Sequence, residues 1–106
     1  MATTGTEAYA QDTPLPQAFG DTARIKIIAA MLSEQDQDIN VTEIARLAGV
    51  ARSTVYDHLD ELRKFNLIDQ TREVAGNPMY QLNTDSPIVE RIDEIEGLLL
   101  RQILDE

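Results

Sequence analysis

TEIARLAGVARSTVYDHLDEL, residues 42–62, decides the fold of this chain. Thr42 can cap a short helix, and Gly49 follows that helix where a left-handed residue would end it. A second helix is predicted from about residue 52 to residue 65. Two short helices joined by a tight glycine-containing turn predict a helix-turn-helix. The apolar residues that recur at helical spacing and can face a core are Ile44, Ala45 and Ala48 in the first helix and Val55, Leu59 and Leu62 in the second.

The flanking sequence supplies one helix before this unit and a hairpin after it. Asp21 can cap a helix over TARIKIIAAMLSE, in which Ile25, Ile28 and Leu32 share one face. The strand-like runs LIDQTREV and PMYQLN flank Gly76-Asn77, which predicts a hairpin with glycine in its turn. On that hairpin, Tyr80 alternates with Leu82 and is expected in the core.

The last predicted element is a helix over residues 86–105, with Ser86 as its cap and Pro87 at its first position. Its heptad-like apolar stripe predicts dimerisation, because a stripe of this size on so small a core would otherwise be an exposed patch. The alternative is that the helix packs on the first helix of its own chain. The stripe expected at the dimer interface consists of Ile88, Ile92, Ile95, Leu99 and Ile103.

The predicted elements divide the chain into three parts. Residues 1–18 are small and polar, with two prolines, and predict a disordered N-terminal arm. Residues 19–83 form the folded domain, and residues 86–105 form the dimerisation helix. The fold class is therefore mostly α with a small β hairpin, in the order α-α-α-β-β-α.

Composition narrows the classes of function. The 106 residues allow one small domain, and no apolar run is long enough to span a membrane. Without a signal peptide pattern, the expected location is cytoplasmic. The chain has no cysteine and one histidine, so we expect no metal site and no cofactor. No phosphate loop or nucleophile triad appears, so an enzyme is not expected.

The formal net charge of −10 is unevenly distributed. Residues 1–20 carry −2, residues 21–83 carry −3 and residues 84–106 carry −5, whereas the stretch from Arg46 to Arg72 carries +1. There are only two lysines among 19 acidic residues, a balance typical of proteins that stay soluble at very high salt.

The segments TEIARLAGV, STVYDHLDEL and TREVAGNPMYQLN make the chain resemble winged-helix transcription regulators, and especially the small single-domain regulators of halophilic archaea. The resemblance covers about residues 19–105. It implies a recognition helix at about 52–65 in the major groove of double-stranded DNA and a wing at about 69–82 on the flanking backbone or minor groove. Relatives often have Ser or Thr at the position of Ala51 and Arg at the position of Asp57.

The resemblance also implies the candidate DNA contacts. Several of them have structural alternatives: Tyr56 could pack on the turn between the helices, His58 could be solvated or hydrogen-bonded, and Arg72 could be a solvated strand residue. Lys64 could form an ion pair with Asp60, four residues earlier. Helical geometry adds Asp57 and Lys64, so the candidate set is Thr42, Arg52, Ser53, Thr54, Tyr56, Asp57, His58, Lys64, Arg72 and Asn77.

At about 100° per residue, Asp57 falls opposite the inward direction of its helix and would face the groove. Three interpretations stay open for this side chain. It is a solvated acid, or it accepts a hydrogen bond from a cytosine amino group, or the helix no longer reads DNA.

The sequence therefore predicts a homodimeric, sequence-specific DNA-binding transcription regulator. The alternative is a winged-helix adaptor that binds a protein partner and does not read DNA. Because high salt suppresses counterion release, a reader with few lysines should show a shallow salt dependence of binding.

Overall fold

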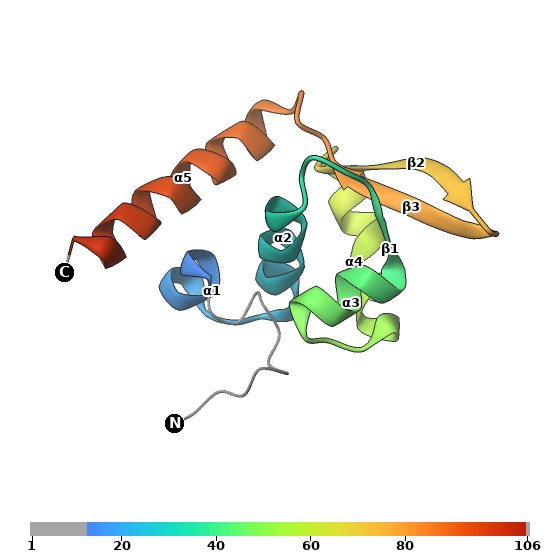
Figure 1. The fold of residues 1–106 in the computed structure, drawn as a ribbon, viewed down its shortest axis with the longest axis horizontal. Helices are drawn as coiled ribbons and strands as arrows, with labels where there is room; N and C mark the ends of the chain where they lie inside the picture. Colours follow the sequence, from blue (N-terminus) through green and yellow to red (C-terminus); the bar gives the residue numbers. More distant parts are fainter. Residues whose placement is uncertain (1–12, 106) are drawn as a thin grey trace.

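The computed structural model describes residues 13–105 and shows five helices packed with one small sheet (Figure 1). The three strands are antiparallel in the order β1-β3-β2. This arrangement is a winged helix-turn-helix, as the sequence predicts. The elements are α1 (Pro14–Phe19), α2 (Ala23–Ser33), β1 (Ile39–Asn40), α3 (Val41–Ala48), α4 (Arg52–Lys64), β2 (Ile68–Val74), β3 (Asn77–Leu82) and α5 (Pro87–Leu104).

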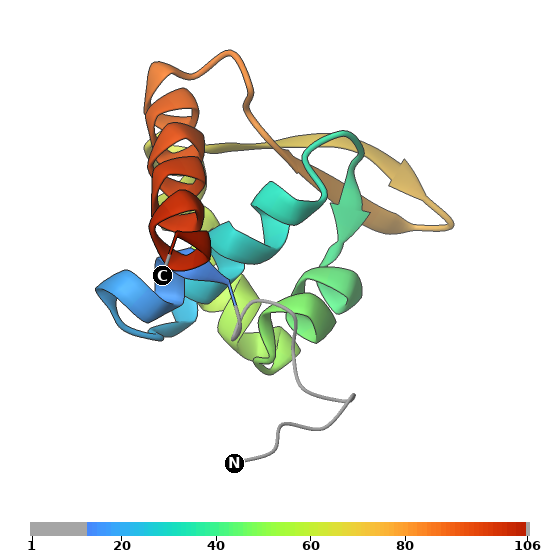
Figure 2. The same cartoon turned by 60° about the vertical axis from the view of Figure 1, so that its left-hand side comes forward.

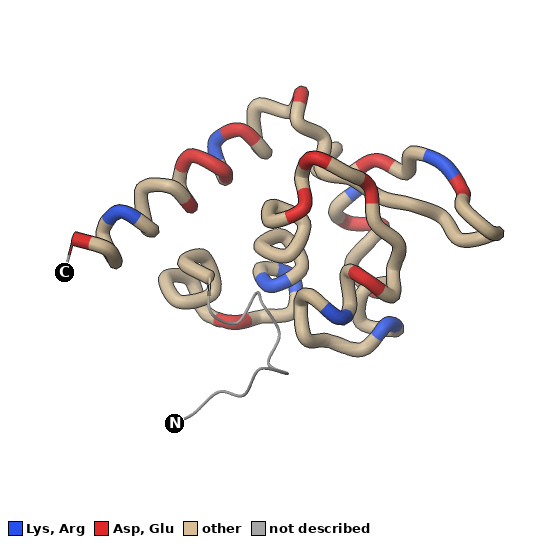
Figure 3. Tube along the Cα trace, viewed as in Figure 1, with Lys and Arg blue, Asp and Glu red and all other residues tan. Residues whose placement is uncertain are grey.

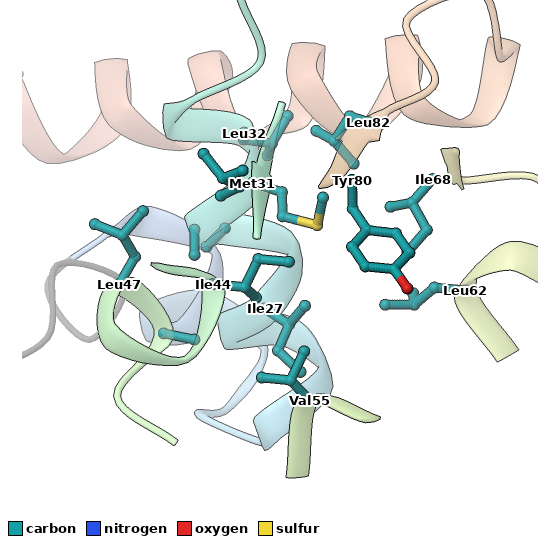
Figure 4. Close-up of a cluster of buried hydrophobic side chains, with 14 of the residues drawn as sticks. Ile27, Met31, Leu32, Ile44, Leu47, Val55, Leu62, Ile68, Tyr80 and Leu82 are labelled. Carbon is teal, nitrogen blue, oxygen red and sulfur yellow. The ribbon is translucent and has the colours of Figure 1, made fainter. Parts of the chain in front are cut away.

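Helix α2 lies at the centre of the fold and is covered on more than one side. It contacts α1, α3, α4 and β3, and its Ile27 is fully buried although it lies outside the predicted apolar face. Ile25 and Ile28 of that face are only partly buried. The predicted face is only part of the buried surface of α2, because α1 and α3 also pack on this helix. Figure 4 shows Ile27 and Met31 of α2 among side chains from α3, α4 and the sheet.

The helix starts differ from the prediction in two places. Helix α2 is capped by Thr22, whose Oγ1 accepts from the Ile25 N–H at 3.3 Å, and not by Asp21. Helix α3 is capped by Asn40, whose Oδ1 accepts from the Glu43 N–H at 2.8 Å. Thr42 is thus the second residue of the helix and not its cap. The reason is that β1, which pairs with β3, leads directly into α3, so its last residue takes the cap position.

Two other predicted termini are confirmed. Gly49 ends α3 in the left-handed region at φ 75°, and its N–H donates to the Ala45 carbonyl. Ser86 caps α5 by accepting from the N–H groups of Ile88 and Val89 at 3.1 and 3.3 Å. A cap of this kind contributes about 1 kcal/mol.

Residues 14–18 are helical, which corrects the prediction that residues 1–18 form a disordered arm. Leu15 of α1 is 2% exposed, and α1 contacts both α2 and α5. Proline is tolerated at the start of a helix because its missing N–H would be unsatisfied there anyway. The rest of the predicted arm, residues 1–12, lies outside the described residues.

The hairpin projects away from the helices as a wing, with its turn at the far end (Figure 1). Val74 pairs with Asn77, so the turn residues are Ala75 and Gly76. Both have positive φ, 52° and 81°, which is typical of a type I′ turn. Asn77 is therefore the first residue of β3. Tyr80 is 6% exposed, which confirms its place in the core.

Helix α5 lies along one side of the molecule against α1 (Figures 1 and 2). Within residues 13–105, no helix is long and apolar enough to cross a membrane. The predicted stripe on α5 is not a single surface. Ile92 and Leu99 pack against the core of their own chain, whereas Ile88 and Ile95 are 51% and 40% exposed.

Candidate nucleic-acid interface

The N-terminal half of α4 presents an uncovered polar strip. Arg52, Ser53, Tyr56 and Asp57 are exposed, and Thr54 is half-buried. The opposite face of the helix is fixed by side chains that are 5% exposed or less, namely Val55, Leu59 and Leu62. This apolar anchoring holds the polar strip outward. Because Ala51 precedes the helix, no side chain caps the first N–H groups of α4.

Tyr56 is 49% exposed, so it does not fill the turn between α3 and α4. A phenol at this position offers an aromatic ring and a hydroxyl that can donate or accept a hydrogen bond. The structure thus leaves Tyr56 accessible to a ligand on the same face as Arg52.

His58 is held by a residue that the sequence analysis missed. Arg24 of α2 donates from Nε to His58 Nδ1 at 3.0 Å, across 34 positions of sequence. A ring nitrogen that accepts a hydrogen bond carries no proton, so in this arrangement the proton of the neutral ring is on Nε2. This arrangement leaves Nε2–H as the donor of the His58 ring, and Arg24 adds a cation beside it.

Asp57 is exposed, and no hydrogen bond or ion pair links its side chain to another residue of the described range 13–105. The predicted pair between Asp60 and Lys64 is also not among the ion pairs of these residues. Lys64 is exposed at the far end of α4, about 18 Å along the helix from Arg52. Lys64 thus lies apart from the N-terminal strip.

Helix α3 contributes an exposed Thr42 and an ion pair. Arg46 donates to both carboxylate oxygens of Glu43, from Nε at 3.1 Å and from Nη2. These hydrogen bonds lower the pKa of Glu43 and raise that of Arg46. Glu43 therefore offsets part of the positive charge that Arg46 brings to this end of the molecule.

The wing carries the last two candidates, Asn77 and Arg72, and only Arg72 forms an ion pair. Asn77 is exposed next to the turn. Arg72 is engaged by Asp38, which receives two hydrogen bonds, from Nε to Oδ2 and from Nη2 to Oδ1, each 3.0 Å long. Thr71 also donates to Asp38 Oδ2. With Arg72 as the first cause and Thr71 as the second, the pKa of Asp38 falls to about 2.

Basic residues are concentrated at one end of the fold, although some acids lie among them (Figure 3). In Figure 3, basic positions gather at the start of α2 and around the α3–α4 turn, whereas acidic positions dominate α5 and the loop between α2 and β1. The basic group consists of Arg24, Lys26, Arg46 and Arg52. The end of the molecule that presents α4 is thus the one suited to a polyanion.

Arg24 and Asp38 are the site residues that sequence reasoning missed. Each contacts a candidate residue 34 positions away. No local pattern predicts such a pair, because the contact depends on how α2 packs beside α4 and on how β1 joins the sheet. Among the described residues, no group of three or more His, Cys, Asp or Glu side chains could hold a metal ion.

Comparison with known families identifies the central part of the chain. Residues 21–70 match the model of the family described as bacterial regulatory protein, arsR family, a range slightly shorter than half of the chain. No curated protein matches the chain. The matched range runs from just before α2 into β2 and so contains the whole helix-turn-helix. That family consists of DNA-binding regulators and not of enzymes, which agrees with the expectation that this chain is not an enzyme. Residues 21–70 are accordingly the DNA-binding helix-turn-helix of a transcription regulator similar to the arsR family.

Proposed function

We propose that this protein is a homodimeric transcription regulator that reads a specific DNA site. Helix α4 enters the major groove, and the wing lies on the flanking backbone or minor groove. One observation carries the proposal: α4 exposes Arg52, Ser53 and Tyr56 on an uncovered strip, at the end of the molecule where the basic residues gather. Thr42 on the neighbouring helix α3 and His58 on the flank of α4 supply further contacts to the DNA backbone.

Homodimerisation through α5 is supported by its exposed apolar residues. Ile88, Ile95 and Leu98 are 51%, 40% and 59% exposed. At about 100° per residue they fall on one flank of the helix, beside the line that packs on the core. A second copy of this chain would cover the flank. Two copies of α4 related by a two-fold axis would then read half-sites about one DNA turn apart.

The excess of acidic over basic residues supports function at high salt. Acids exceed bases by ten in the chain, yet the segment from Arg46 to Arg72 is nearly neutral. We infer that affinity comes mainly from base contacts and shape, and that added salt weakens binding only slightly. A steep loss of affinity with salt would contradict this inference.

The experiment is a selection from random DNA in molar potassium chloride, followed by footprinting of the selected site. Arg52→Ala should weaken binding about 10- to 100-fold, the range expected when a bidentate contact to guanine is lost. Arg101→Ala is the matched control, because it removes the same charge from α5 and should leave binding unchanged. If no sequence is selected, or if the Arg52 variant binds DNA as the wild type does, the DNA-reading proposal fails.

Asp57 gives the selection a second readout. A carboxylate in the groove can accept from the amino group of cytosine but repels the acceptor atoms of guanine. If Asp57 makes this contact, Asp57→Ala should relax the preference for cytosine at one position. An unchanged preference identifies Asp57 as a solvated acid. Absence of any selected site, together with a captured protein partner, would favour the adaptor alternative, in which α4 binds protein.

A further inference from the structure

The ion pair between Asp38 and Arg72 spans the sheet. Asp38 directly precedes β1 and Arg72 lies on β2, the two outer strands, with β3 between them. Arg72 stands opposite Met79 of β3 and reaches past that strand to the carboxylate. The pair therefore ties the wing to the body of the protein.

A bulge in β2 makes this arrangement possible. The register between β2 and β3 shifts between Gln70 and Arg72, so the backbone of Thr71 stands opposite no residue of β3. In a regular strand, consecutive side chains point to opposite faces, but a bulge re-aims one of them. As a result, Thr71 and Arg72 both donate to the same carboxylate of Asp38. The bulge thus places two donors of β2 on one carboxylate.

The two partners differ in exposure, which decides how easily they separate. The Asp38 side chain is 11% exposed and that of Arg72 is 64% exposed. If Arg72 moved to a phosphate, Asp38 would be left as an unpaired carboxylate with little access to water, beside a polyanion. An Arg–carboxylate fork has the same bidentate geometry as an Arg–phosphate fork, so the exchange would bring no gain in contacts.

Arg72 is also the only cation among residues 68–82, which contain two acids, Asp69 and Glu73. Once Arg72 is paired, the wing presents no free positive charge. We propose that Asp38 is a positioning residue that occupies Arg72 in place of a DNA phosphate, so that the wing approaches DNA without a cation to contribute. This inference rests on the proposed DNA-binding function and refines it: the wing contacts DNA through shape and polar groups such as Asn77.

The test compares Asp38→Asn with variants that isolate the role of Arg72. Binding constants for the selected DNA site are measured over a series of potassium chloride concentrations. Asp38→Asn should strengthen binding several-fold and steepen the slope of log K against log salt by about 0.9, the contribution of one new phosphate contact. Arg72→Ala alone should leave the slope unchanged, and the double variant should have the slope of Arg72→Ala.

Asp36→Asn is the matched control. Asp36 is an exposed acid in the same loop, and it forms no ion pair with any residue of the described range. Its replacement should leave the slope unchanged, because it frees no cation. Urea unfolding of each variant checks that the wing remains folded, since a merely structural role for Asp38 would move stability and not the salt slope.

Two results overturn the inference. The first is a flatter slope for Arg72→Ala alone, which would mean that Arg72 already contacts phosphate in the wild type. The second is a steeper slope for Asp38→Asn that persists without Arg72. If the wild type binds its site but the Asp38 and Arg72 variants do not show the expected slopes, the proposed function stands and only this inference is overturned. If no variant binds DNA, both are overturned.

Discussion

The exposed flank of α5 gives a quantitative prediction for Leu98→Glu. Burial of a whole leucine side chain is worth about 1.5–3 kcal/mol, and 59% of the residue is exposed in the single chain. Covering the exposed part of Leu98 in a dimer should stabilise the dimer by about 1 kcal/mol or more per protomer, and the two-fold axis doubles this free energy. Leu98→Glu should therefore raise the dimer dissociation constant at least about 30-fold, and two carboxylates in an apolar seam add to that effect.

The assay is light scattering or sedimentation equilibrium across a range of protein concentrations in molar salt. Leu100→Glu is the matched control: Leu100 is 45% exposed, but it lies two residues away on the helix and hence about 200° around it. Circular dichroism should show the same helix content for both variants, because neither side chain is buried in the chain itself. A wild type that is monomeric at tens of micromolar, or equal weakening by the two substitutions, would refute the reasoning.

Two further predictions concern stability. Leu15→Ala should lower the free energy of unfolding by about 2–4 kcal/mol in urea titrations, because Leu15 is 2% exposed and anchors α1, whereas Phe19→Ala, at a residue 62% exposed, should have little effect. Equal effects would mean that α1 does not dock as described. Glu96→Gln should raise the urea midpoint at pH 7, because burial, and then the charge of Asp93, raise the pKa of Glu96 in the folded protein. A raised carboxyl pKa favours the protonated form, so the gain in stability from glutamine should shrink as the pH falls through that pKa. Glu94→Gln, at an exposed glutamate, is the control. A gain in stability that does not change with pH would count against this explanation.

Local patterns in the sequence were sufficient for the main elements. The glycine at position 49, the cap at Ser86 and the apolar spacing in α4 each act over a few residues, so they predict helix ends and inward faces directly. The cap of α3 was misplaced because Asn40 and Thr42 are both good capping residues. What decides between them is the pairing of β1 with β3, a contact with residues 79 and 80.

Helix α1 illustrates a second limit of sequence reasoning. Its six residues contain two prolines and one leucine, a composition that predicts disorder when taken alone. A helix this short is not stable by itself. It forms because Leu15 is buried where α1 contacts α2 and α5, and α5 comes from residues far along the chain.

The distribution of charge in the fold explains how an acidic chain can present a helix to DNA. The acids of α5 lie on the far side of α2 from the α3–α4 turn (Figure 3), and in molar salt the screening length is only about 3 Å. Near the proposed interface, Glu43 is paired with Arg46, and Asp38 with Arg72. Asp57 is an exposed acid on the N-terminal half of α4, and its side chain has no partner in the described part of the chain. In the proposed orientation, this carboxylate disfavours the acceptor-rich edge of guanine and tolerates donors. If α4 reads DNA in this orientation, we expect Asp57 to affect the choice of sequence more than the affinity.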